Sequence, residues 1–193
     1  MLNIKEVTLS GNHIILRPPR SDDEAGLRNA ARDGEVWKNP YAFFPNIEEM
    51  SHYLQELVNH DQTNLPFIIM LKASEQIVGT TRFLNIDSHN GRLEIGHTWI
   101  AKSFRRTFVN TEAKFLMLQY AFEDLNCIAV EIRTDVLNVT SRKAIERLGA
   151  KMDGILRSHK IMREGRIRDT VSYSIIKDEW PDVKEILLQK MRT

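Results

Sequence analysis

The chain has 193 residues, of which 42% are hydrophobic and 27% charged, proportions typical of one soluble globular domain spanning residues 1–193. Its 27 basic and 26 acidic side chains leave a formal net charge of +1, which argues against nucleic acid as a direct partner. The single cysteine, Cys127, excludes an intramolecular disulfide, and the six scattered histidines give no metal site, so we expect none. We expect Cys127 to be buried as a small hydrophobe rather than to act as a catalytic thiol.

The N-terminal residues lack the pattern of a signal peptide, and no apolar stretch approaches the roughly 20 residues that span a bilayer. We therefore expect a cytoplasmic protein without a membrane partner. In chain order, residues 13–19 predict a short strand that ends in two prolines, and residues 21–33 predict a helix with a serine cap. A second helix is expected over residues 46–60, with an apolar stripe formed by Ile47, Met50, Tyr53, Leu54, Leu57 and Val58.

Three strands follow as an antiparallel meander, at about residues 65–71, 76–86 and 92–100. Alternation in the third strand puts Leu93, Ile95, His97 and Trp99 on one face and Glu94 on the other, unless a bulge near Gly96 resets it. A mostly apolar helix is expected over residues 112–126, with Glu112, Gln119, Glu123 and Asn126 on one narrow polar stripe.

The rest of the chain predicts a strand at 128–134, a helix that starts at Asn138 and stops at Gly149, a hairpin over 154–176 and a closing helix. The fold class is therefore α/β (α+β): a mixed, mostly antiparallel sheet of six to seven strands with helices on both faces. Its central parallel pair must be the strands at 92–100 and 128–134. The loop at 101–111 follows the first of these strands, at the sheet edge where open α/β sheets bind ligands.

Four stretches carry a resemblance to a known family: "LEIGHTWI", "RRTFVNTEAKFLMLQYAFE", "VEIRTDVLNVTSRKAIERLGAKMDGILR" and "DTVSYSIIKDEWPDVK", which together span roughly residues 93–184. The chain resembles the GCN5-related N-acetyltransferases (GNAT), in the branch of the ribosomal-protein alanine N-acetyltransferases. This resemblance implies a splayed parallel pair of central strands. It also implies direct transfer of acetyl from acetyl-CoA to a primary amine, without a covalent enzyme intermediate.

The family's pyrophosphate loop has Gln or Arg, two residues, Gly, one residue, then Gly or Ala. In this chain the aligned residues are Arg105, Arg106, Thr107, Phe108, Val109 and Asn110, followed by Thr111, so Phe108 and Asn110 replace the small residues. Backbone N–H groups at a helix start can hold a pyrophosphate whatever their side chains, provided that Phe108 keeps ordinary torsions and turns its ring away. Asn110 would serve as the N-cap, and the two arginines would contact phosphate; a solvated arginine pair before a capped helix is the alternative.

The resemblance also assigns roles at the helix that starts at Asn138. Asn138 would bond the pantetheine arm, and Ser141 would donate a proton to the departing CoA thiolate, with simple packing of its hydroxyl as the alternative. Arg142 faces outward on the helical pattern and would reach the CoA 3′-phosphate or remain a solvated charge. The backbone of the strand at Ile95, His97 and Trp99 would contact acetyl-CoA and polarise the acetyl carbonyl.

The attacking amine must lose a proton, so a base or a water relay is needed. Glu94 is our first candidate because it lies on the central strand, and His97 and Asp135 are the others. The acceptor amine would enter between residues 34–46 and the hairpin 157–170, where Trp37, Tyr41, Phe43 and Phe44 would form a wall or pack in the core.

A protein or peptide N-terminus is the expected acceptor. A small amine (antibiotic, polyamine or amino acid) and a non-catalytic acyl-CoA-binding module are the alternatives. We expect a monomer or a homodimer.

Overall fold

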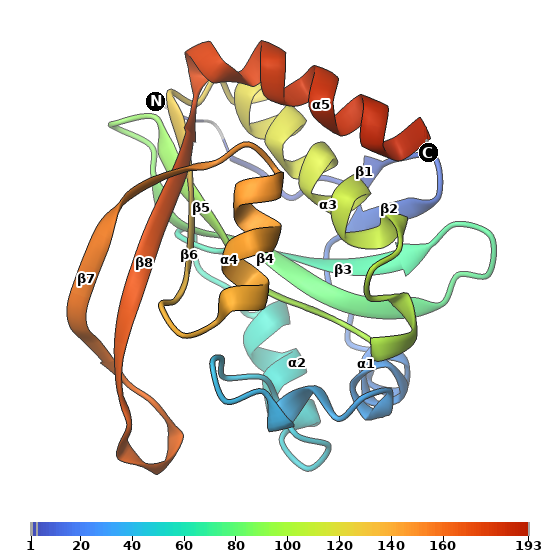
Figure 1. Ribbon diagram of the computed structural model, residues 1–193. Helices are drawn as coiled ribbons and strands as arrows, with labels where there is room; N and C mark the ends of the chain where they lie inside the picture. Colours follow the sequence, from blue (N-terminus) through green and yellow to red (C-terminus); the bar gives the residue numbers. More distant parts are fainter. Residues whose placement is uncertain (1, 3, 193) are drawn as a thin grey trace.

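The computed structural model describes residue 2 and residues 4–192, which form an eight-stranded sheet with the order β1-β2-β3-β4-β5-β6-β8-β7 (Figure 1). The strands are β1 Leu9–Ser10, β2 Ile14–Arg17, β3 Leu65–Leu71, β4 Ile77–Asp87, β5 Arg92–Ile100, β6 Ala129–Asp135, β7 Lys151–Ile161 and β8 Ile167–Ile176. The helices are α1 Glu24–Arg32, α2 Met50–Val58, α3 Phe108–Gln119, α4 Val139–Arg147 and α5 Trp180–Arg192. The predicted order of elements is confirmed, and the strand beyond the expected six to seven is the two-residue β1, which is too short to show an alternating pattern.

Helices cover both faces of this sheet, and each face has its own buried cluster (Figure 1). On one face α3, α4 and α5 pack against apolar side chains of β2 to β8, with Trp180 of α5 stacked on Phe122 at 5.4 Å. On the other face α1 and α2 cover the first half of the sheet, with Leu27, Tyr53 and Leu57 in the cluster. The buried residues of α2 match the predicted stripe, except that Val58 is exposed.

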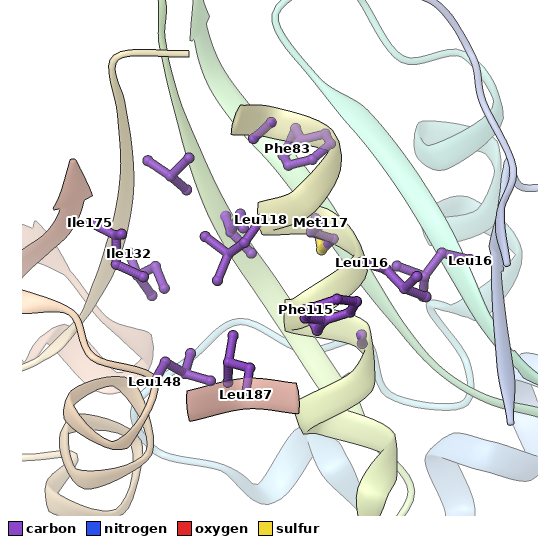
Figure 2. Packing of buried hydrophobic residues seen from close by; sticks show 14 of the residues in the cluster. Leu16, Phe83, Phe115, Leu116, Met117, Leu118, Ile132, Leu148, Ile175 and Leu187 are labelled. Atoms are coloured by element: carbon purple, nitrogen blue, oxygen red, sulfur yellow. The ribbon is translucent and has the colours of Figure 1, made fainter. Parts of the chain in front are cut away.

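Helix α3 is surrounded by core residues (Figure 2), as its nearly continuous apolar sequence predicts. It starts at Phe108 rather than at Glu112, and after Gln119 it continues as a π-helical turn, Tyr120–Asp124. Glu112, a member of the predicted polar stripe, is buried, and its carboxylate accepts the His13 backbone N–H at 2.9 Å. Cys127 is fully buried, and this desolvation raises the pKa of its thiol to about 11, so the expectation of a structural cysteine is confirmed.

Strands β5 and β6 form the predicted parallel pair, but their pairing runs only from Arg92–Ala129 to Glu94–Glu131. Beyond Glu94, β5 remains paired with β4, whereas β6 remains paired with β8. The two strands therefore diverge toward their carboxyl ends. The backbone groups that β5 turns toward β6 after Glu94 consequently have no ladder partners in β6.

A bulge in β5 accompanies this divergence. Thr80 of β4 pairs with Trp99 and Arg82 pairs with Gly96, so His97 and Thr98 of β5 face the single residue Thr81 of β4. His97 adopts a left-handed backbone conformation (φ 48°), which allows the extra residue. The bulge was expected near Gly96 and lies one residue later.

The bulge also changes which side chains share a face. Ile95 stays in the cluster under α3, whereas Trp99 packs in the cluster under α2 and donates its indole N–H to Tyr53 Oη at 3.1 Å. Leu93, Ile95, His97 and Trp99 therefore do not all lie on one face, because the bulge resets the alternation, the exception that the sequence allowed for.

Candidate active site

The loop from Ala101 to Thr107 ends at the N-terminus of α3. Arg106 takes the left-handed conformation (φ 61°), and Thr107 is the N-cap, with its hydroxyl accepting the Val109 N–H at 3.3 Å. Asn110 therefore lies inside the first turn and is not the cap, contrary to the sequence expectation, because the threonine hydroxyl three residues earlier takes that role. The loop is braced by α1, since Asp33 accepts the N–H groups of Lys102 and Ser103.

Phe108 has the ordinary backbone torsions that anion binding at this position was expected to require, and its ring packs against another side chain. It is the first residue of α3 and has helical torsions, and its ring lies against the His13 ring at 4.7 Å between centroids. The left-handed torsion that a glycine would supply in this loop is instead supplied by Arg106. In the first turn of α3 the Val109 N–H is bonded to the Thr107 hydroxyl, whereas the N–H groups of Phe108 and Asn110 have no acceptor within the helix. These two amides and the positive end of the helix dipole remain available to an anion.

The side chains of this loop are placed differently from one another. Arg105 donates its Nε–H to the Ile100 carbonyl at 2.9 Å, which ties it to the end of β5, while Arg106 is exposed. Val109 is fully buried, so only its backbone can reach a ligand, and Thr111 is half-buried in the first turn of α3. Anion contacts are thus offered by backbone amides and by Arg106.

Helix α4 begins four residues after the end of β6, so its N-terminus lies at the carboxyl end of one of the two divergent strands. Asn138 caps it, with Oδ1 accepting the Ser141 N–H at 3.0 Å, and the second side-chain group of Asn138 is an amide that can donate. Ser141 is half-buried, and no hydrogen bond of its hydroxyl to the described part of the chain is observed. Arg142 was expected to face outward, but its Nε–H donates to Tyr173 Oη at 3.1 Å and Nη1 donates to the Val136 carbonyl. It bridges α4 to the sheet.

Glu94 lies at the last paired position of β5, where the two central strands separate. Its side chain is buried, with Asn85 Nδ2 donating to Oε2 at 2.7 Å and the Arg133 guanidinium 3.7 Å away. Burial raises the pKa of Glu94, and the opposing effects of Arg133 and Asn85 are smaller. A carboxylate with a raised pKa at a strand divergence can take up a proton from an amine.

The other two candidates for the base have different surroundings. The His97 side chain is exposed to solvent, yet many protein atoms surround it. The resulting desolvation, and to a smaller extent the positive charges of Arg82, Lys160 and Arg168, lowers the pKa of His97 to about 4. Its imidazole is therefore neutral at pH 7. Asp135 is fully buried and accepts hydrogen bonds from Arg166 Nη2 and from the Leu137 N–H, so it is engaged in holding the strand end.

Sequence reasoning missed several charged residues of this region. Glu131 lies beside Glu94 in the parallel register and accepts two hydrogen bonds from Arg133. Lys114 of α3 is buried among apolar neighbours and donates to Thr98 Oγ1 in the bulge. The signal for Lys114 was present, because a lysine interrupts the most apolar helix of the chain, but the helical pattern was read only for its apolar residues.

The 37–44 segment and the β7–β8 hairpin, between which the acceptor was expected to enter, contact each other. Arginines of the hairpin donate to backbone carbonyls of this segment: Arg163 to Phe44 at 3.0 Å, Arg166 to Pro40 at 3.1 Å and Arg168 to Tyr41 at 3.3 Å. Trp37 and Phe44 pack on the α1–α2 cluster, whereas Tyr41 and Phe43 lie under Arg166 and Arg163. Core packing is thus observed for Trp37 and Phe44, whereas a substrate wall formed by this segment stays a prediction.

A sheet whose central strands separate beside the free amides of a helix N-terminus is the arrangement of an acyltransferase that takes its acyl group from a CoA thioester. A family model described as "Acetyltransferase (GNAT) domain" matches residues 13–151. The chain belongs to the GNAT acetyltransferase family and is an N-acetyltransferase. The family uses acetyl-CoA, and the residues present fit it, since the α3 amides and the unpaired β5 edge offer donors to its pyrophosphate and its amide-containing arm.

Two relatives and a solved structure support this assignment. The chain is 28% identical over 177 residues to "Uncharacterized N-acetyltransferase p20" of Bacillus licheniformis, covering 90% of this chain and 98% of that protein. It is 36% identical over 108 residues to "Putative ribosomal N-acetyltransferase YdaF" of Bacillus subtilis, covering 56% and 58% of the two chains. A crystal structure of a GCN5-related N-acetyltransferase from Brucella melitensis superposes with a TM-score of 0.88 at 27% identity, covering 97% of this chain and 86% of that one. The resemblance to the GNAT family is thereby confirmed.

No helix in the described part of the chain is both long and apolar enough to cross a membrane.

Proposed function

We propose that this protein transfers the acetyl group of acetyl-CoA directly to the N-terminal amine of a protein or peptide. The observation that carries the proposal is the divergence of β5 and β6 after Glu94. It gives a thioester a place between the strands, with the α3 amides on one side and a polar, charged sheet face on the other. The acceptor amine would approach from that polar face, between the 37–44 segment and the β7–β8 hairpin.

Separate groups of residues would bind the cofactor and transfer protons. The open first-turn amides of α3, those of Phe108 and Asn110, with Arg106, would hold the pyrophosphate, and Asn138 Nδ2 would bond the pantetheine arm. Backbone N–H groups of β5 between Ile95 and Trp99 would polarise the acetyl carbonyl. Glu94 would accept the amine proton directly or through water, and the unengaged Ser141 hydroxyl would return a proton to the CoA thiolate.

The surface beside the hairpin favours a peptide over a small amine. A hollow of about 780 Å³ is lined by residues of both hairpin strands: Ile155, Leu156, Arg157, Ser158, His159 and Asp169. All but Asp169 are exposed, so the hollow is an open surface and not a closed pocket. Open surfaces of this kind suit the remainder of a polypeptide better than they suit a small molecule, which is usually enclosed.

The test is a thiol-release assay with acetyl-CoA and a panel of peptides, polyamines and free amino acids, with acetylated products located by mass spectrometry. We expect acetylation at peptide N-termini. Turnover on small amines alone would replace the peptide acceptor by a small-molecule one, and CoA binding without any turnover would indicate a non-catalytic module.

The proton donor has its own test. Ser141→Ala should lower kcat by about 10²-fold or more while leaving the KM for acetyl-CoA close to that of the wild type, because proton transfer to a leaving group contributes on that order. Ser103→Ala, on the exposed loop before α3, is the control. An unchanged kcat would leave Ser141 with a packing role only.

A further inference from the structure

Three cationic side chains, Arg82, Lys160 and Arg168, converge on His97 from different strands. Arg82 is paired with Gly96 next to the bulge, and its guanidinium lies 5.3 Å from the centre of the Tyr53 ring of α2. Arg168 donates to the Tyr41 carbonyl, and Lys160 stands directly opposite Arg168 in the β7–β8 ladder. All three are close enough to His97 for their charges to lower its pKa.

These cations share one face of the sheet. Tyr53 and Tyr41 belong to the α1–α2 side, and directly opposite residues of an antiparallel ladder point to the same face. The N-terminus of α3, where the phosphates of CoA would bind, packs on the other face. The three cations are therefore placed toward the acceptor and not toward the cofactor.

In the described chain none of these three cations forms an ion pair, although Asp135 and Glu94 attract Arg168, and Glu94 attracts Lys160, at longer range. Within the described residues, none of the three lies within 4.0 Å of a carboxylate oxygen, and the buried Nε of Arg82 has no hydrogen-bond partner. The carboxylates of the same face are already engaged: Glu131 by Arg133, Asp135 by Arg166, Asp153 by Ser174 and Glu94 by Asn85. Arg168 is only 9% exposed, and its burial lowers its pKa.

This arrangement opposes stability rather than promoting it. Like charges directly opposite in a ladder, as at Lys160 and Arg168, repel each other, and a buried guanidinium without a carboxylate carries a desolvation penalty. An oxyanion in the space beside His97 would relieve both effects. Arginine binds carboxylate and phosphate in a fixed, two-pronged geometry, which gives position as well as affinity.

We propose that the acceptor carries an anionic group, a carboxylate or a phosphate, close to its reactive amine, and that Arg82, Lys160 and Arg168 bind it. This inference rests on the proposed N-acetyltransferase function and defines its acceptor class: a peptide whose N-terminal amine is followed at the next positions by an acidic or phosphorylated residue. The α-carboxylate of a free amino acid offers the same chemistry from another source.

The test compares acceptors that differ only in this charge. Peptides that begin Ala-Asp, Ala-phosphoserine, Ala-Asn and Ala-Lys, together with free alanine and alaninamide, are assayed for kcat/KM at saturating acetyl-CoA. We expect the anionic member of at least one matched pair to be favoured about tenfold or more, as one charge-assisted contact provides. The pair that shows the preference identifies the source of the anion.

Variants connect the preference to the three residues. Arg168→Gln and Lys160→Gln should each remove most of the preference while preserving the affinity for CoA, which also shows that the variants are folded. Lys160→Glu should shift the preference toward Ala-Lys. Lys151→Gln, which makes the same charge change on the same strand at an exposed site paired with Glu179, should keep it.

Two results would count against the inference in different ways. Acetylation of neutral and anionic acceptors at equal kcat/KM overturns the inference and leaves the proposed function standing. No acetylation of any member of the panel overturns the proposed function and, with it, the acceptor class.

Discussion

Lys114 is a normally charged residue whose side chain is buried. Its side chain is buried beneath α3, with Nζ 2.6 Å from Thr98 Oγ1 and 3.3 Å from Thr81 Oγ1 and no carboxylate partner in the described chain. Desolvation lowers the pKa of Lys114 to about 7. Because Thr98 is part of the β5 bulge, this contact fixes the strand segment whose backbone would meet the acetyl group.

The pKa of Lys114 predicts a pH-dependent stability. The unfolded chain binds this proton up to about pH 10.5 and the folded chain only up to about pH 7, so folding becomes more favourable as the pH rises through that interval. Urea unfolding at pH 7 and pH 9.5 should show a gain for the wild type that Lys114→Met lacks, on the order of a few kcal/mol. Lys72→Met, at an exposed site, should retain the gain, and parallel profiles for wild type and Lys114→Met would contradict the buried lysine.

Glu94 should have the opposite effect on how stability depends on pH. Its pKa is raised by burial, so the folded state favours the protonated form, and stability is lost as the pH rises from the ordinary carboxyl range through the raised value. Glu94→Gln should therefore unfold at a higher temperature than the wild type at pH 7, while kcat falls about 10²-fold for lack of a base. Glu75→Gln on an exposed turn should change neither, and an unchanged kcat in Glu94→Gln would transfer the role of base to His97 or water.

At the scale of elements, the β7–β8 hairpin acts as one unit with the 37–44 segment. The arginines that connect them reach across more than 100 residues of sequence, and Arg163 also lies 3.7 Å from Glu49 and over the Phe43 ring. Each exposed contact is weak, but together they would set the width of the proposed acceptor entrance.

This connection predicts a kinetic effect on the acceptor alone. Arg163→Ala should raise the KM for the peptide several-fold with little change in the KM for acetyl-CoA, because the contacts of Arg163 are with the 37–44 segment and Glu49 and not with the N-terminus of α3. Arg192→Ala at the exposed end of α5 is the matched control. Equal changes in both Michaelis constants would mean that the hairpin supports the whole fold rather than the entrance.

At the scale of the whole molecule, two halves of the sheet meet at the short parallel pairing of β5 and β6. A ligand that bonds to the separated strands and to the starts of α3 and α4 would join both halves. CoA at one hundred times its dissociation constant should therefore stabilise the fold by about 2.7 kcal/mol, as linkage requires for any ligand of the native state. A thermal shift that rises with CoA concentration is the measurement; Arg105→Ala with Arg106→Ala should reduce it, and an unchanged shift would remove those side chains from the site.

Local patterns were sufficient for the elements and their order. Alternating and helical apolar patterns predicted every long strand and helix, and the crossover from β5 through α3 to β6 required a parallel pair. The loop before α3 could also be placed, because it had to follow β5 at the carboxyl edge of the sheet. Burial of Cys127 followed from its apolar surroundings in the sequence.

What only the tertiary structure decided depends on contacts between residues distant in sequence. The bulge at His97 moved Trp99 to the opposite face, since a strand's alternation holds only until its partner strand loses register. The N-cap of α3 is Thr107 rather than Asn110, and Arg142 points inward because it donates to the Tyr173 hydroxyl. The convergence of Arg82, Lys160 and Arg168 arises from three strands, and no linear pattern records it.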